Sequence, residues 1–333
     1  MSFGYKVLGF GSGGAANKFL TATGGTTVTC GNYKTHIFTG DDTFTVCGVG
    51  ACAANNVVDY LVVAGGASGG IGRGGGGGAG GFRVFSTAPG SNSPLNNSGA
   101  SPNTEVTVTA TAYPIAVGGG GAGKSYPSPS NDGNVGGVST FDTVTSAGGG
   151  FGAAGHGGAC NDGGSGGGSG YFGPGSPLGA GSGNTPPVSP AQGQDGGDTT
   201  ATGSPTPTPQ RAGGAGGGAG GVGGSSSPGG FGQGGIGSYI ADSFVGPTAP
   251  SYGTAGPVGS TRYFAGGGGA GAEAGPGGAA PDGGGGTAGS GTGATSAGTV
   301  NTGGGTGGSG EAQPSSATGS GGSGIVMIRY QFQ

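Results

Sequence analysis

The segment GGGGAGKS at residues 118–125 could bind a nucleotide, because it matches the P-loop pattern G-x-x-x-x-G-K-[ST]. In a P-loop, the lysine and the backbone N–H groups hold the phosphates at the N-terminus of a helix. Here Ser125 is followed by YPSPSNDG, whose two prolines and terminal glycine do not form such a helix. We therefore interpret Lys124 as an exposed loop lysine.

Other patterns that resemble catalytic sites have little weight in a chain with 100 glycines among 333 residues. Matches to G-x-G-x-x-G arise by chance at this frequency and lose their value as a dinucleotide fingerprint. His36 and His156 have no partner that the sequence can name, and Asp195 and Asp198 are typical of turns. We predict a protein that is not an enzyme, with no catalytic residues and no cofactor.

The four cysteines do not form a zinc-binding pattern. Only Cys47 and Cys52 approach the ligand spacing of a zinc site, and both histidines are isolated. We expect the cysteines to be small buried hydrophobic residues or to form one disulfide in the N-terminal part. No metal site is predicted.

Composition excludes several classes of protein. Nine basic and 13 acidic residues give a net charge of −4, so a basic patch that binds nucleic acid has no support. The strict G-X-Y period of collagen is absent. The N-terminus lacks the pattern of a secretory signal, and the longest apolar run, YLVVA at 60–64, is too short to cross a bilayer. A flexible Gly/Ser linker remains the alternative for any single glycine run.

Alternating apolar and polar residues predict a small antiparallel β-module at residues 27–64. Two arms joined at 39–42 are typical of a β-hairpin, and VVDYLVVA at 57–64 indicates a strand that is buried on both faces. GIVMIRY at 324–330 is its natural partner, so we assign 325–333 to the closing strand. We assign residues 1–26 to an N-terminal attachment segment.

Residues 65–324 then form an insertion anchored at both ends. It contains strand-like segments at 81–87, 104–118 and 138–150, and glycine interrupts every possible helix. Polyglycine II helices have three residues per turn and no internal hydrogen bonds, so packed side by side they satisfy one another's backbone groups. The predicted fold class is therefore mainly β and irregular, with almost no α-helix and a bundle of polyglycine II-like helices.

A series of segments in the same order resembles the glycine-rich domain of bacteriophage tail-fibre and adhesin proteins. The series is HIFTGDDTFTV (36–46), DYLVVAGGASGG (59–70), GGGGGAGGFR (74–83), YPIAVGGGGAG (113–123), GGVSTF (136–141), YFAGGGGAGA (263–272) and SGIVMIRY (323–330). The resemblance covers residues 33–330. It implies a virion component on the exterior of the particle, whose loops on a polyglycine II bundle bind a host cell-surface receptor, protein or glycan.

On this basis we expect a tail-fibre tip or adhesin that is made without a signal peptide and binds other virion proteins through its N-terminal segment. A homotrimer is one possible assembly, since fibres of the resembled class are commonly trimeric. The alternative is an architectural capsid decoration or fibre-shaft protein with no receptor. Aromatic rings stack well on flat ligands. Aromatic residues in glycine-poor loops are therefore the receptor-binding candidates, or else they cover the ends of the bundle: Tyr171, Phe172, Tyr239, Tyr252, Tyr263 and Phe264.

Overall fold

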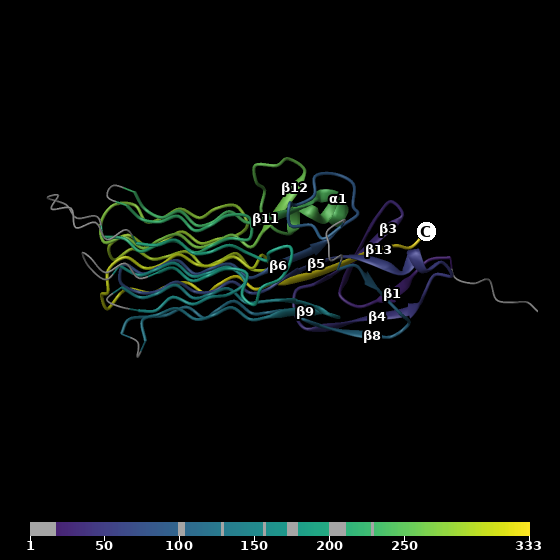
Figure 1. The fold of residues 1–333 in the computed structure, drawn as a ribbon, viewed down its shortest axis with the longest axis horizontal. Coiled ribbons are helices and arrows are strands. Elements are labelled where there is room, and N and C mark those ends of the chain that lie inside the picture. The colour runs from purple at the N-terminus through teal and green to yellow at the C-terminus, as the bar shows by residue number, and fades with distance from the viewer. Residues whose placement is uncertain are drawn as a thin grey trace, which may run out of the picture.

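The computed structural model describes residues 18–98, 104–127, 130–155, 158–171, 179–199, 211–227 and 230–333. The molecule is elongated, with β-strands gathered at one end and long glycine-rich segments running side by side toward the other (Figure 1). The strand end is a sandwich of two antiparallel sheets, and the glycine-rich part is called the glycine bundle below.

Two sheets make up the sandwich. The six-stranded sheet has the order β2 (Thr26–Cys30), β3 (Tyr33–Phe38), β13 (Ile325–Gln331), β5 (Val57–Val63) and β6 (Phe82–Phe85), with β7 (Val106–Thr107) also paired to β5. The five-stranded sheet has the order β1 (Thr21–Thr23), β4 (Asp42–Gly48), β8 (Ala112–Ala116), β9 (Ser139–Phe141) and β10 (Val144–Ser146). A short 3-10 helix, η1 (Ala53–Asn56), precedes β5.

The C-terminal strand β13 lies between β3 and β5, which confirms the predicted pairing of GIVMIRY with VVDYLVVA. Ile325 is opposite Val63, and Met327 is opposite Leu61. Side chains of β13 alternate between two cores: Val326 and Ile328 face the second sheet, while Ile325 and Met327 face outward into a separate core. Both faces of β5 and β13 are buried, as the apolar sequence of each predicted.

The hairpin predicted across residues 39–42 is wrong. β3 and β4 belong to different sheets, since β3 pairs with β2 and β13 whereas β4 pairs with β1 and β8. The chain crosses from one sheet to the other between β3 and β4, and Phe38 and Phe44 both enter the core between the sheets. β3 instead forms a hairpin with β2.

Strands form in each of the three strand-like segments of the predicted insertion. β6 lies within 81–87, β7 and β8 lie within 104–118, and β9 and β10 lie within 138–150. All five strands belong to the two sheets of the sandwich. The β-module therefore extends beyond the boundaries 27–64 and 325–333, because the second sheet takes β8, β9 and β10 from the insertion. It also takes β1 from residues 1–26, which were expected to form only an attachment segment.

A small lobe covers part of the outer face of the six-stranded sheet (Figure 1). It consists of β11 (Ser238–Ala241), α1 (Asp242–Val245), the 3-10 helix η2 (Gly246–Ser251) and β12 (Thr261–Phe264). Phe244 and Phe264 are fully buried against apolar residues of β5, β6 and β13. α1 is four residues long and is the one α-helix of the described chain, in line with the predicted scarcity of helix.

The glycine bundle is held together by backbone hydrogen bonds between segments, with a period of three residues. In the segment 74–81, the N–H groups of Gly74, Gly77 and Gly80 donate to one neighbouring segment, at residues 309, 306 and 303. The N–H groups of residues 75, 78 and 81 donate to a second segment, at the carbonyl groups of residues 153, 150 and 147. The N–H groups of residues 76 and 79 donate to a third segment, at the carbonyl groups of residues 214 and 217. The carbonyl groups of 74–81 accept from three further segments, 64–70, 165–168 and 268–271.

The segment 74–81 is thus surrounded by six neighbours, three that accept its hydrogen bonds and three that donate to it. A repeat of three residues is that of the polyproline II type of helix, to which polyglycine II belongs, and the assignment of these segments to polyglycine II stays a prediction. The neighbours lie so close that a Cβ atom on Gly75 would be 1.9 Å from the carbonyl oxygen of Gly168. Glycine is therefore the contact surface of this part of the molecule.

His36 on β3 is expected to make the stability of the sandwich depend on pH. Its ring is fully buried, its Nδ1 donates to the carbonyl oxygen of Gly24 at 2.6 Å, and its Nε2 accepts from the Tyr330 hydroxyl at 3.1 Å. Burial lowers the pKa of His36 below its ordinary value of 6.5. The unfolded chain then binds more protons at acid pH, so stability decreases as the pH falls below that value.

We expect the free energy of unfolding of the wild type to decrease from about pH 7.5 to about pH 5 relative to a His36→Gln variant, which has no imidazole to protonate. Linkage limits the relative change to about 1.4 kcal/mol for each pH unit. Urea unfolding of both proteins at each pH measures it. Parallel pH profiles for the two proteins would contradict the expectation. The second histidine, His156, lies outside the described residues.

Candidate binding surface at the loop end of the glycine bundle

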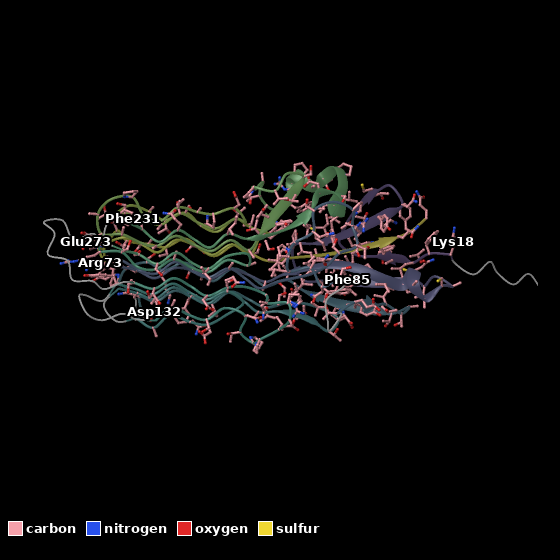
Figure 2. The ribbon with its side chains drawn as sticks, turned by 45° about the horizontal axis from the view of Figure 1, so that its top comes forward. Lys18, Arg73, Phe85, Asp132, Phe231 and Glu273 are labelled. Carbon is pink, nitrogen blue, oxygen red and sulfur yellow. The ribbon has the colours of Figure 1, made fainter. Side chains whose placement is uncertain are left out.

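The glycine bundle carries a set of turns at its end away from the sandwich. Arg73, Asp132, Phe231 and Glu273 lie at this loop end, and Lys18 lies at the opposite end of the molecule (Figure 2). The chain runs out to the loop end and back repeatedly, so residues that are far apart in the sequence meet there. Hydrogen bonds between neighbouring segments fix the positions from which these turns begin.

An ion cluster joins three of the turns. The Glu273 carboxylate lies 3.7 Å from Nε of Arg73 and 3.3 Å from Nη1 of Arg211. The backbone N–H of Glu273 also donates to the carbonyl oxygen of Arg211 at 2.8 Å. The side chain of Arg211 is 40% exposed, and that of Arg73 is 16% exposed. Two guanidinium groups therefore share one carboxylate at a surface that solvent reaches.

Arg73 is held in an unusual backbone conformation at this end. Its φ of 60° lies in the left-handed region, which residues other than glycine seldom adopt. Its N–H donates to the carbonyl oxygen of Gly310, and its own carbonyl accepts from the N–H of Tyr171 at 3.1 Å. Such strain persists only where the surrounding structure imposes it, and it is found often at binding sites.

Asp132 and Phe231 complete the described part of the loop end. Asp132 caps a neighbouring segment, since its Oδ1 accepts from the N–H of Ala154 at 2.7 Å. The half-buried ring of Phe231 lies over the turn at Gly275, where a Cβ atom would be 2.7 Å from Cζ of the ring. The loop end thus offers charged, polar and aromatic groups on a scaffold of backbone hydrogen bonds.

A family model described as a glycine-rich domain matches residues 39–331. The chain belongs to this family. The match includes β5, β13 and all the described segments of the glycine bundle. The glycine-rich domain therefore comprises most of the sandwich together with the described glycine bundle. A search of curated proteins finds no match to the chain.

The aromatic residues predicted to bind a receptor do not gather at one place in the glycine-rich domain. Tyr171 is half-buried at the loop end, where its N–H is bonded to Arg73. Phe172 lies outside the described residues. The other four belong to the lobe at the sandwich end of the bundle: Tyr239, Tyr252, Tyr263 and Phe264.

Burial corrects the expectation for two of these four residues. Phe264 has no exposed surface and Tyr263 is 3% exposed, so neither side chain can contact a receptor in this conformation. Both lie on β12, where Phe264 enters the core under the lobe and Tyr263 packs on Tyr239 with ring centroids 5.1 Å apart. Tyr239 and Tyr252 are half-buried and keep some exposed surface.

Sequence reasoning missed Arg73, Arg211, Phe231 and Glu273. The signal that could have indicated the three charged residues is their rarity, because only 7% of the residues of the chain are charged. Arg73 interrupts a glycine run, and Glu273 lies between two alanines that follow one. Their meeting could not have been predicted, since about 200 residues separate them.

The P-loop-like residues 118–125 form a segment of the glycine bundle. The N–H of Lys124 donates to Oγ1 of Thr318 at 3.0 Å, and no helix follows in the described residues up to 127. All four cysteines carry free thiols, and Cys47 and Cys52 are exposed, so the expectation of buried or disulfide-bonded cysteines is wrong.

Neither a metal-binding cluster nor a membrane-spanning helix is present in the part of the chain that the structure describes. No three histidine, cysteine or acidic side chains gather there in a way that could hold a metal ion. The described helices are also too short to cross a membrane.

Proposed function

We propose that this glycine-rich domain is a non-enzymatic structural protein of a bacteriophage virion, at the tip of a tail fibre or adhesin, that binds a host cell-surface receptor. One observation carries the proposal: a bundle held by hydrogen bonds in three directions presents the Arg73–Glu273–Arg211 cluster and Tyr171 at the end opposite the sandwich. A rigid scaffold with its polar and aromatic groups on loops is an arrangement that favours binding.

The two ends of the molecule suit two partners. Lys18, the first described residue, lies at the sandwich end, far from the labelled loop residues (Figure 2). In the proposal, the N-terminal residues that precede β1 bind other virion proteins, because the rest of the expected attachment segment 1–26 belongs to strands β1 and β2 of the sandwich. The loop end points away from the particle toward a host protein or glycan. The placement of the protein on the exterior of the virion belongs to the same proposal, as does a homotrimeric assembly.

Binding of the purified protein to host bacteria tests the proposal. We expect Tyr171→Ala and Arg211→Ala each to weaken binding by about tenfold or more, because tyrosine and arginine are the residues that most often dominate binding energy at interfaces. Tyr239→Ala is the matched control, since Tyr239 is a half-buried tyrosine in the lobe. Thermal unfolding of each variant separates a loss of binding from a loss of fold.

Two outcomes would count against the receptor proposal. Binding that survives both substitutions at the loop end but is lost in Tyr239→Ala would move the binding surface to the lobe. Location on the capsid together with an absence of cell binding would favour the architectural alternative, a capsid decoration or fibre-shaft protein.

A further inference from the structure

A second polar site lies on the outer face of the six-stranded sheet, beyond the lobe. The register of three adjacent strands places Thr35 of β3, Arg329 of β13 and Asp59 of β5 in one row across the sheet. The lobe covers the apolar half of this face. Thr35 lies at the edge of the lobe, because the Thr35 hydroxyl donates to the carbonyl oxygen of Phe244 at 2.7 Å. Beyond this row, Gln331 of β13 lies opposite Tyr33 of β3.

Arg329 and Asp59 form a buried ion pair there. Nη1 of Arg329 donates to Oδ2 of Asp59, and the side chains are 3% and 5% exposed. The guanidinium carbon lies 3.6 Å from the centroid of the Tyr33 ring, and the Arg329 Nε has no hydrogen-bond partner. Oδ1 of Asp59 accepts from the N–H and the hydroxyl of Thr87, both at 2.9 Å. The pair is therefore rigid and is fixed from both sides.

A cavity of about 250 Å³ opens beside this pair. Arg329 and Asp59 line it together with Tyr33, Asn55, Glu105 and Gln331. The amide group of Asn55 donates to the carbonyl oxygen of Lys18 at 2.9 Å, and that of Gln331 donates to the carbonyl oxygen of Gln333 at 3.0 Å. Hydrogen bonds to the backbone thus orient both amides at the edge of the cavity.

The lining determines the chemistry of the ligand. Two carboxylates and one guanidinium give it a formal charge of −1, so an anion is repelled. Carboxylate oxygens only accept hydrogen bonds, guanidinium groups only donate, and amides do both, so the ligand must offer donors and acceptors together. A hydroxyl group does this, and the ring of Tyr33 adds an apolar surface. The volume is below the usual range for drug-sized ligands, which favours a single ring.

We propose that this cavity binds one unit of a neutral sugar. Its hydroxyl groups would bond to the amides of Asn55 and Gln331 and to the Glu105 carboxylate, with the sugar ring against the part of Tyr33 that Arg329 leaves uncovered. The site lies on the sandwich and shares no residue with the loop end. The proposal therefore goes beyond the receptor-binding function proposed above and does not depend on it.

NMR titration of the full chain with the methyl glycosides of glucose, galactose, mannose and N-acetylglucosamine tests the proposal. We expect at least one of the four to shift the side-chain amide signals of Asn55 and Gln331, and Gln331→Ala to weaken its Kd by about tenfold. Glucuronate, an anionic sugar of similar size, should bind more weakly than the methyl glucoside because of Asp59 and Glu105.

Controls separate this site from the loop end. Gln233→Ala removes a glutamine of the glycine bundle whose amide also bonds to a backbone carbonyl, and Arg211→Ala alters the loop end. Both should leave the Kd unchanged. Should Gln331→Ala fold poorly, Tyr33→Leu provides a second variant with the same expected loss. The proposal is overturned if none of the four glycosides shifts either amide signal, if binding is unaffected by Gln331→Ala and Tyr33→Leu, or if glucuronate binds more tightly than the glucoside.

Discussion

Gly75→Ala is expected to lower the free energy of unfolding by about 3 kcal/mol, the upper part of the usual range for an overpacked core. Gly75 is buried in the central segment of the glycine bundle, and the new methyl group would lie 1.9 Å from the carbonyl oxygen and 2.4 Å from the carbonyl carbon of Gly168. Relief of this contact requires backbone movement, because no side chain is present that could rotate away. Movement of one segment also breaks hydrogen bonds to its six neighbours.

Gly119→Ala is the matched control. Gly119 is exposed at the side of the bundle, and a Cβ atom there would have no other atom within 4 Å. Both substitutions reduce the freedom of the unfolded chain equally, an effect that stabilises by about 0.4–1 kcal/mol where the native conformation accepts alanine. The difference between the two variants in urea unfolding therefore measures the contact alone. Equal stabilities would show that the segments can separate to admit a methyl group.

Asp59→Ala is expected to cost about 3–5 kcal/mol, the range measured when one partner of a buried ion pair is removed. The reason is that the substitution leaves the buried guanidinium of Arg329 without a carboxylate partner. Arg329 is 3% exposed, and among the described residues its ion pair is with Asp59. The N–H of Thr87 would lose its acceptor as well. Urea unfolding at neutral pH measures the effect.

The double variant Asp59→Leu with Arg329→Met tests that reason. Replacement of both charges with apolar side chains of similar volume is often neutral or stabilising. We therefore expect it to recover most of the stability lost in Asp59→Ala, except for the unpaired N–H of Thr87. If the double variant were as unstable as Asp59→Ala, the unpaired charge of Arg329 would not be the cause of the lost stability. The geometry of the sheet would then depend on the ion pair.

Much of the sandwich could be predicted from local pattern. VVDYLVVA and GIVMIRY are apolar on both faces, and that is possible only for strands with a core on each side, as β5 and β13 have. The hairpin across 39–42 failed because alternation shows which residues of a strand face a core but not which sheet the strand joins. Phe38 and Phe44 are compatible with either arrangement in sequence, and the core between the sheets selects one.

For the loop end, prediction from sequence reached Tyr171 but not the charged residues beside it. The sequence indicates aromatic residues in glycine-poor loops as binding groups, and these include Phe264, which is buried under the lobe. Exposure of a side chain depends on the segments packed around it. The short stretch 261–264 gives no sign that β11 and α1 will cover it.

The sequence alone determined that glycine is the contact surface of this protein and that two apolar strands anchor the array. Only the tertiary structure decided which segments are neighbours, and thereby brought Arg73, Arg211 and Glu273 together and placed Asp59 beside Arg329. The physical reason lies in the bonds involved. Backbone N–H and C=O groups are the same in every glycine run, so they stabilise any pairing of segments and specify none. Neighbours are selected by the sandwich, by the turns and by the few side chains that the array can accommodate.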